Sequence, residues 1–454
     1  MVAYTIITAW NLGLMVTIAR WRGVTSYEGL GMALLALVVG SDYGGLCLAL
    51  AFGGDSADLR SMVALRIWPG LVHVLGILCF GLGLLVASPN PPKVRRELSE
   101  DDRRQLAYAG SFLAVLGISM KLLALGSEGI TSIGEYFTNV YTYNAAQRKL
   151  GTFWDWGASI AMFGVTLLAA TYEGRRVKQL VCVVSLAVLA FFLTSSRAGI
   201  AGAMLMFFVV MLAFNPRTAR KWFRPRVLAS LFLLLVVSSG IKTQLRFAPG
   251  NTAGVKTDWG ELAGQALSTF GTRFGSSGVY SGFANMVDRQ SHDPALFMDG
   301  RVLAYTLTAW IPHLVFPYKP VHPFRDIGYL TRPNFSSRYD TVYAPTLVGY
   351  AWADFGVASV IGYLFLGAFL LGLLRRPLER PDVPILVVAG YLHLMLVEGA
   401  TNLIHNGFLG LSASGLLAIG SMGLAAVYVT GRRSLDAIAT TAATPAATSG
   451  ALDG

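Results

Sequence analysis

Apolar residues in this chain fall into runs long enough to cross a lipid bilayer, with shorter polar stretches between them. About 20 consecutive apolar residues span a bilayer as one helix, and the pattern predicts about eleven such helices. We expect them near residues 3–19, 28–53, 62–87, 105–125, 153–171, 177–194, 198–214, 227–243, 345–374, 383–400 and 409–430. The predicted fold is therefore an all-α, polytopic integral membrane protein.

Basic residues gather in alternate connections between these runs, which fixes the expected orientation. Lys and Arg accumulate on the cytoplasmic side of membrane proteins. The clusters are Arg20 and Arg22; Lys93, Arg95, Arg96, Arg103 and Arg104; Arg175, Arg176 and Lys178; Arg217, Arg220, Lys221, Arg224 and Arg226; Arg375, Arg376 and Arg380; and Arg432 and Arg433. We therefore predict an external N-terminus, a cytoplasmic C-terminus and an external position for the region 241–345.

The region 241–345 is the one long stretch that is polar, arginine-rich and aromatic together. Within it, residues 302–316 form an apolar run that contains Pro312 and is too short to span. Such a run is typical of a re-entrant or interfacial helix. The tail 434–454 is rich in Ala and Thr, which predicts a disordered cytoplasmic segment. We expect residues 1–433 to form a single multi-span membrane domain.

Composition agrees with this class. The chain is 54% hydrophobic and 13% charged, with a mean hydropathy of +0.55, whereas soluble domains average about 25% charged residues. The net charge of +11 does not indicate a nucleic-acid partner, since Lys and Arg in membrane proteins collect in cytoplasmic loops and contact lipid headgroups. The three cysteines lie in apolar runs without metal-ligand spacing.

Arginine beside aromatic rings suits a ligand that carries phosphate at one end and sugar rings at the other. Arg197 lies in a tight turn of small residues at 194–199, where the alternative is an arginine that extends from a helix end to water. Arg273 lies in the Gly/Ser-rich segment 270–278, which suits an anion-binding concavity or, alternatively, a flexible loop. Further candidates for contacts with phosphate or glycan are Arg246, Arg289, Lys319, Arg325, Arg338 and Tyr339.

Four residues are candidate proton acceptors. His313 and His322 lie on a proline-stiffened external segment, and histidine titrates near neutral pH. Asp354 and Glu398 lie at predicted outer helix ends. The alternatives are hydrogen-bonded structural histidines and structural ion pairs across helices.

Asp42 is a charged residue in the middle of a predicted span. A charge in that position is costly unless it is paired. We expect Asp42 to pair with Arg66 or His73 on the next span along the chain.

Several common catalytic motifs do not occur. The chain has no GxxxxGK[ST] phosphate loop, no HExxH and no DxD pair on an external loop. This argues against a metal-dependent nucleotide-sugar site and favours a donor that carries its own leaving group. We expect no metal and no cofactor.

Four segments together resemble a known family. The block 311–320 (IPHLVFPYKP) is followed by 347–356 (LVGYAWADFG), and the turn 195–199 (SSRAG) and the loop 270–274 (FGTRF) carry arginines. Together they resemble the Wzy-type O-antigen and exopolysaccharide polymerases, which are related to O-antigen ligases. His313 stands where the family pattern often has arginine.

The resemblance implies a metal-independent glycosyltransferase with a GT-C-like fold in the bacterial inner membrane. Such an enzyme transfers a growing glycan from undecaprenyl pyrophosphate to the next lipid-linked repeat unit on the external face, with a flippase and a chain-length regulator as partners. Two alternatives remain: an O-antigen ligase-like transferase with another acceptor, and a transporter or flippase for lipid-linked oligosaccharides. A transporter would keep its polar residues near the midplane, so the polar external region favours surface chemistry.

Overall fold

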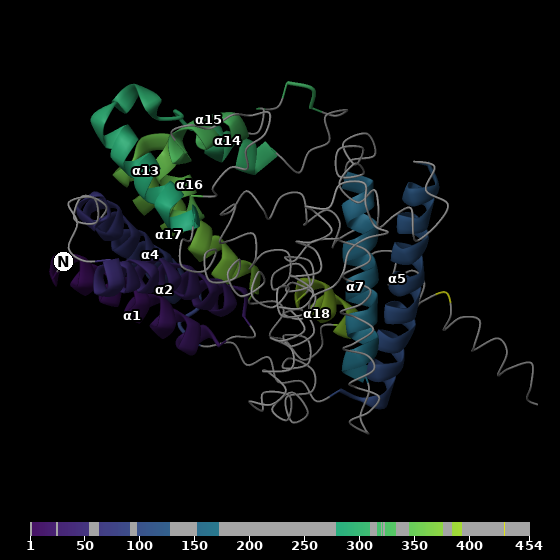
Figure 1. Cartoon of the computed structure of the whole chain (residues 1–454). Coiled ribbons are helices and arrows are strands. Elements are labelled where there is room, and N and C mark those ends of the chain that lie inside the picture. The colour runs from purple at the N-terminus through teal and green to yellow at the C-terminus, as the bar shows by residue number, and fades with distance from the viewer. Residues whose placement is uncertain are drawn as a thin grey trace, which may run out of the picture.

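The computed structural model describes residues 2–23, 26–53, 63–90, 98–127, 152–171, 278–308, 316–318, 320, 323–332, 345–375, 384–392 and 431. These residues form helices and contain no strand, which confirms the predicted helical class (Figure 1). The helices are α1 (Val2–Arg22), α2 (Tyr27–Gly53), α4 (Ile67–Ala87), α5 (Glu100–Ser127), α7 (Thr152–Thr171), α13 (Gly278–His292), η1 (Pro294–Leu296), α14 (Arg301–Thr308), α15 (Phe324–Thr331), α16 (Thr346–Phe355), α17 (Val357–Arg375) and α18 (Ile385–Leu392).

Three helical segments are long and apolar enough to cross a membrane. They are Val2–Arg22, Val63–Ala87 and Glu100–Leu123, and each overlaps a predicted span. Shorter apolar stretches occur at Glu28–Gly40 and Val357–Leu373. These helices are consistent with a membrane protein. The spans expected at 177–243 and 409–430 lie outside the described residues, so the count of about eleven and the GT-C-like fold stay predictions.

The helices α1, α2, α4 and α17 form one packed group whose directions follow from their contacts. α1 and α4 run parallel, since Ile7 lies against Gly70 and Ile18 lies against Gly81. α17 also runs parallel to α4, because Leu364 lies against Gly76 and Ala87 against Gly372. α2 runs antiparallel to α1, with Tyr43 near Tyr4 and Gly40 near Leu12. These directions agree with the predicted topology, in which α1, α4 and α17 begin on the external side and α2 begins on the cytoplasmic side.

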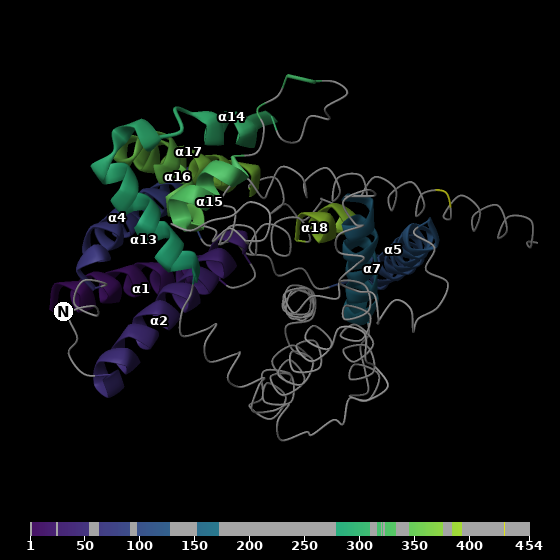
Figure 2. The same ribbon diagram turned by 45° about the horizontal axis from the view of Figure 1, so that its top comes forward.

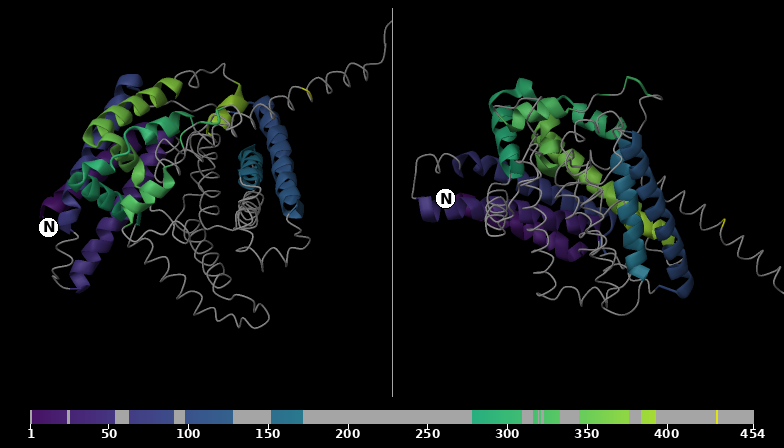
Figure 3. Two further views of the ribbon diagram at one scale, coloured as in Figure 1. Left: turned by 90° about the horizontal axis from the view of Figure 1, so that it is seen from above. Right: turned by 45° about the vertical axis from the view of Figure 1, so that its right-hand side comes forward.

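Glycines set how closely the helices approach. A Cβ atom at Gly83 of α4 would lie 2.3 Å from the carbonyl oxygen of Phe365 on α17. The antiparallel pair α5 and α7, which lie side by side in both views of Figure 3, uses the same device. There a Cβ at Gly117 would lie 2.3 Å from the amide nitrogen of Ala161. Small residues that let backbones touch are typical of helix pairs in membranes.

The segments 278–308, 323–332 and 345–356, hereafter the cap, lie at the N-terminal ends of α4 and α17 (Figure 2). Within the cap, α13 packs against α15 and α16 and also against α2 and α4, and α14 packs against α16. The predicted topology places this end of α4 and α17 outside the membrane.

Two predicted boundaries change in the structure. The single span predicted at 345–374 is wrong, because α16 ends at Phe355 and α17 begins at Val357. Gly356 lies between them with a φ of +62°, a left-handed conformation that glycine adopts readily and that ends a helix. The short helix expected near 302–316 is present as α14 over Arg301–Thr308. Residues 309–315 lie outside the described residues.

Candidate functional site

Two of the predicted site residues, Asp354 and Arg289, have described side chains. Arg325 lies in the first turn of α15, where the structure describes its backbone. The other candidates lie outside the described residues: Arg197, Arg246, Arg273, His313, Lys319, His322, Arg338, Tyr339 and Glu398. The site can therefore be built from the cap around α14, α15 and α16.

Asp354, in the last turn of α16, is fully buried and caps α14. Its Oδ1 accepts a hydrogen bond of 3.0 Å from the amide of Val302, and its Oδ2 accepts one of 2.9 Å from the amide of Leu303. The side chain of Tyr363 on α17 forms a further hydrogen bond to the carboxylate. Asp354 was predicted as a candidate proton acceptor at an outer helix end, and the two backbone hydrogen bonds to its oxygens argue against that role.

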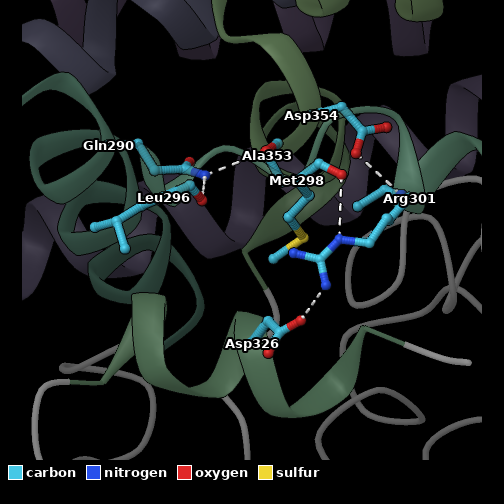
Figure 4. A network of polar contacts seen from close by, with 8 residues as sticks. Gln290, Leu296, Met298, Arg301, Asp326, Ala353 and Asp354 are labelled. Atoms are coloured by element: carbon cyan, nitrogen blue, oxygen red, sulfur yellow. Dashed lines mark hydrogen bonds and ion pairs between the residues drawn. The ribbon is translucent and has the colours of Figure 1, made fainter. Parts of the chain in front are cut away.

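The turn before α14 is held by the same end of α16 (Figure 4). The amide of Met298 donates to the carbonyl of Ala353 over 2.9 Å. Gln290 Nε2 donates to the carbonyls of Leu296 and Ala353, at 2.8 and 3.2 Å. Gly300 has a φ of +82°, which lets the chain reverse into α14. The last turn of α16 thus fixes where α14 begins.

Arg301, the first residue of α14, points toward α15 (Figure 4). Its Nη1 lies 2.9 Å from Asp326 Oδ2, and its Nε donates to the carbonyl of Met298 over 3.3 Å. The two side chains of the ion pair are 59% and 46% exposed, so a solvent-borne anion can reach the guanidinium. Arg301 was not among the predicted site residues, because nothing in its local sequence separates it from the other arginines of the region.

Arg289 contacts the other end of α15. Its Nη1 donates to the carbonyl of Tyr329, and Asn285 Nδ2 on the same helix donates to the carbonyl of Thr331 over 3.1 Å. These carbonyls belong to the last turn of α15, where a helix lacks internal donors and favours positive charge.

Four arginines therefore lie on or against α15, and we call them the arginine cluster. Arg301 contacts the Asp326 side chain near the start of α15, and Arg289 contacts the Tyr329 carbonyl in its last turn. The other two members belong to α15 itself, as Arg325 in its first turn and Arg332 at its C-cap. Arginine guanidinium groups bind phosphate through two parallel hydrogen bonds. Within the described residues, this cluster is the arrangement best suited to a phosphate-bearing ligand.

A second polar cluster lies beneath the cap and is closed to solvent. Arg66 Nε lies 3.1 Å from Asp42 Oδ2, and the two side chains are 6% and 3% exposed. Ser281 of α13 accepts a 2.7 Å hydrogen bond from Arg66 Nη2 and lies 3.4 Å from Asp42 Oδ1. The predicted pairing of Asp42 with Arg66 is confirmed, whereas His73 lies 3.2 Å from Asn11 Oδ1 instead. This network joins α2 and the start of α4 to the cap.

Tyr280, next to Ser281 on α13, is buried with its ring against His73, at a centroid distance of 5.8 Å. Burial raises the pKa of this phenol, and the nearby Tyr4 and Asp42 raise it further. The side of α13 that carries Tyr280 is thus uncharged and aromatic, and it lies beside the ion pair of Asp42 and Arg66. This surface serves packing of the cap on the helices below it.

The described residues contain no group of three or more His, Cys, Asp or Glu side chains placed to share a metal ion. The absence of a metal requirement stays a prediction of the sequence analysis. Comparisons of the chain with protein-family models, with curated proteins and with solved structures gave no match. A functional assignment therefore depends on the geometry of the cap and on the resemblance of the sequence motifs.

Proposed function

We propose that this protein is a glycan polymerase of the inner membrane. It transfers a growing chain from undecaprenyl pyrophosphate to the next lipid-linked repeat unit on the external face. The arginine cluster around α15 is the observation that carries the proposal. The guanidinium groups of Arg289 and Arg301 lie in the cap, next to helices apolar enough to lie among lipids.

The reaction asks for little covalent chemistry from the protein. The acceptor hydroxyl attacks the anomeric carbon, the bond from that carbon to the pyrophosphate oxygen breaks, and the hydroxyl proton passes to a base. The departing pyrophosphate carries the developing charge, and fixed cations stabilise such charge better than water does. Attack from the side opposite the leaving group gives inversion at the anomeric carbon.

The arginines should therefore contribute more to the rate than the base, whose help is worth about 10²–10⁴-fold. His313, His322 and Glu398 stay candidates for that base, and Asp354 is withdrawn on the hydrogen bonds described above. Arg197 and Arg273 stay candidates for the pyrophosphate contact together with the arginine cluster.

The position of the charges favours a transferase over a transporter. A transporter binds its substrate near the membrane midplane, on broken helices. Among the described residues, the buried pair of Asp42 and Arg66 is already neutralised and hydrogen-bonded to Ser281. Arg301, whose side chain is 59% exposed, lies in the cap and is open to solvent.

A reconstituted reaction tests the proposal. Purified protein in lipid nanodiscs would receive synthetic undecaprenyl-pyrophosphate repeat units in excess EDTA, and products would be separated by size. We expect a ladder of polymers. Arg301→Ala should lower the initial rate by roughly ten- to a hundredfold, the effect of losing hydrogen bonds to a charged group. Arg301→Lys should restore part of the rate, because the charge is kept and the planar fork is lost.

Arg104→Ala is the matched control. Arg104 is an exposed arginine paired with Glu100 one turn away on α5, far in sequence from the cap, and its loss should leave the rate unchanged. Failure to consume the lipid-linked units would contradict the proposal, as would a reaction that stops in EDTA and returns with divalent metal. Consumption that needs an added lipid A-core acceptor would instead identify a ligase.

A further inference from the structure

The end of α16 determines where Arg301 lies. The amide of Met298 donates to Ala353, and the amides of Val302 and Leu303 donate to Asp354. Arg301 lies between these hydrogen-bonded amides, so the position of its backbone is set by the end of α16. Its guanidinium then reaches Asp326 and the carbonyl of Met298.

The carboxylate of Asp354 supplies hydrogen-bond acceptors for the first backbone amides of α14. The first amides of any helix have no acceptor within the helix, and α14 is only 8 residues long, a length at which helices are unstable alone. Asp354 accepts hydrogen bonds from two of these amides at once. Without it, the first turn of α14 would fray, and Arg301 is in that turn.

We infer that Asp354 is a positioning residue that holds Arg301 of the arginine cluster in place for the anionic end of the lipid donor. This inference rests on the proposed function. A proton acceptor needs an oxygen that a substrate hydroxyl can approach, and Asp354 is fully buried with both oxygens bonded to α14. Its negative charge stabilises the first amides of α14, and Asp354 affects the ligand only by positioning Arg301.

The test uses Asp354→Asn, which keeps the side-chain shape but turns an amide NH₂ toward one of the two backbone donors. Hydrogen–deuterium exchange would report the protection of residues 301–305. Titration with undecaprenyl pyrophosphate, the probe ligand, would report donor affinity of the protein in nanodiscs. We expect faster exchange over 301–305 and an apparent Kd raised roughly tenfold, within the range for hydrogen bonds to a charged group.

A double mutant separates positioning from general destabilisation. Since Asp354 acts through Arg301, Asp354→Asn should add almost nothing to the affinity already lost in Arg301→Ala, whereas independent sites add. The pH dependence of the rate should keep its shape in Asp354→Asn. If that variant does not fold, Tyr363→Phe removes one supporting contact of the carboxylate and should show a smaller shift in the same direction.

Three outcomes overturn the inference. One is additive loss of affinity in the double mutant, and another is faster exchange with donor affinity unchanged. The third is a collapse of turnover with unchanged affinity and loss of the acidic limb of the pH profile, which would make Asp354 the base. These results differ from failure of the proposed function, in which the wild-type protein itself shows no affinity for undecaprenyl pyrophosphate.

Discussion

Removing Arg66 should destabilise the protein severely, because it leaves the carboxylate of Asp42 buried without its counter-ion. The pair is almost inaccessible, with side chains 6% and 3% exposed. Breaking a buried ion pair from one side costs about 3–5 kcal/mol. Folded domains are stable by only about 5–15 kcal/mol in total. Arg66→Ala should therefore remove a large share of the free energy of unfolding.

Two further variants apportion this loss. Ser281→Ala removes the hydroxyl that accepts from Arg66 Nη2 over 2.7 Å, and we expect it to cost about 1–2 kcal/mol. The double variant Asp42→Asn with Arg66→Met removes both charges of this pair. Its loss in free energy of unfolding should be smaller than the sum of the losses in the two single variants by at least about 1 kcal/mol, because contacting residues are coupled.

Chemical unfolding in detergent micelles, followed by tryptophan fluorescence, measures these differences. Arg104→Ala is the control, since Arg104 and Glu100 form an exposed pair, and exposed pairs contribute little. An Arg66→Ala protein that unfolds at the same denaturant concentration as the wild type would refute the reasoning. An equally large loss of stability in Arg104→Ala would also refute it, because removal of any positive charge, buried or not, would then explain the effect.

Other variants test separate features. Gly83→Leu should separate α4 from α17, since even a Cβ atom would lie 2.3 Å from the Phe365 carbonyl; unchanged thermal stability would contradict this close approach. Asp326→Asn should raise the affinity for undecaprenyl pyrophosphate a few-fold, because it releases Arg301 from an exposed pair, and weaker binding would argue against Arg301 as a ligand. Burial raises the pKa of Tyr280 above its ordinary value of 10.0, so the folded state retains a proton that the unfolded state releases, and stability falls as the pH rises above about 10. Tyr280→Phe should lessen that fall between pH 9 and 11, and an equal decline in both proteins would count against it. Cysteine labelling should reach Ser277→Cys from outside and Ser434→Cys from the cytoplasm; the reverse pattern would invert the predicted topology.

The long helices were predictable because many residues contribute to each of them. The predicted spans 3–19 and 62–87 match α1 and α4 closely, since hydrophobic burial acts along a whole run of residues. The pairing of Asp42 with Arg66 was also predictable, because a charge in an apolar span needs an opposite charge within reach.

Features that depend on one residue or on distant partners were not predictable. The break at Gly356 arises from a single backbone dihedral angle, which a hydropathy pattern over 345–374 does not register. Asp354 was predicted as a proton acceptor at an outer helix end because its partners, Val302 and Leu303, lie 52 and 51 positions earlier in the chain. Nothing local to either segment indicates that the two meet. Arg301 was missed for the same reason.

The parallel contact between α4 and α17 has a consequence for how the protein is made. Roughly 270 residues separate the two helices, and ribosomes add about 5–20 residues per second. The surface of α4 that carries Gly76 and Gly83 must therefore wait on the order of 15–50 s, on the same rates, before its partner emerges. During that interval lipid or the insertion machinery must cover it. Variants that slow synthesis between α4 and α17 should thus lower the yield of inserted protein without altering the finished molecule.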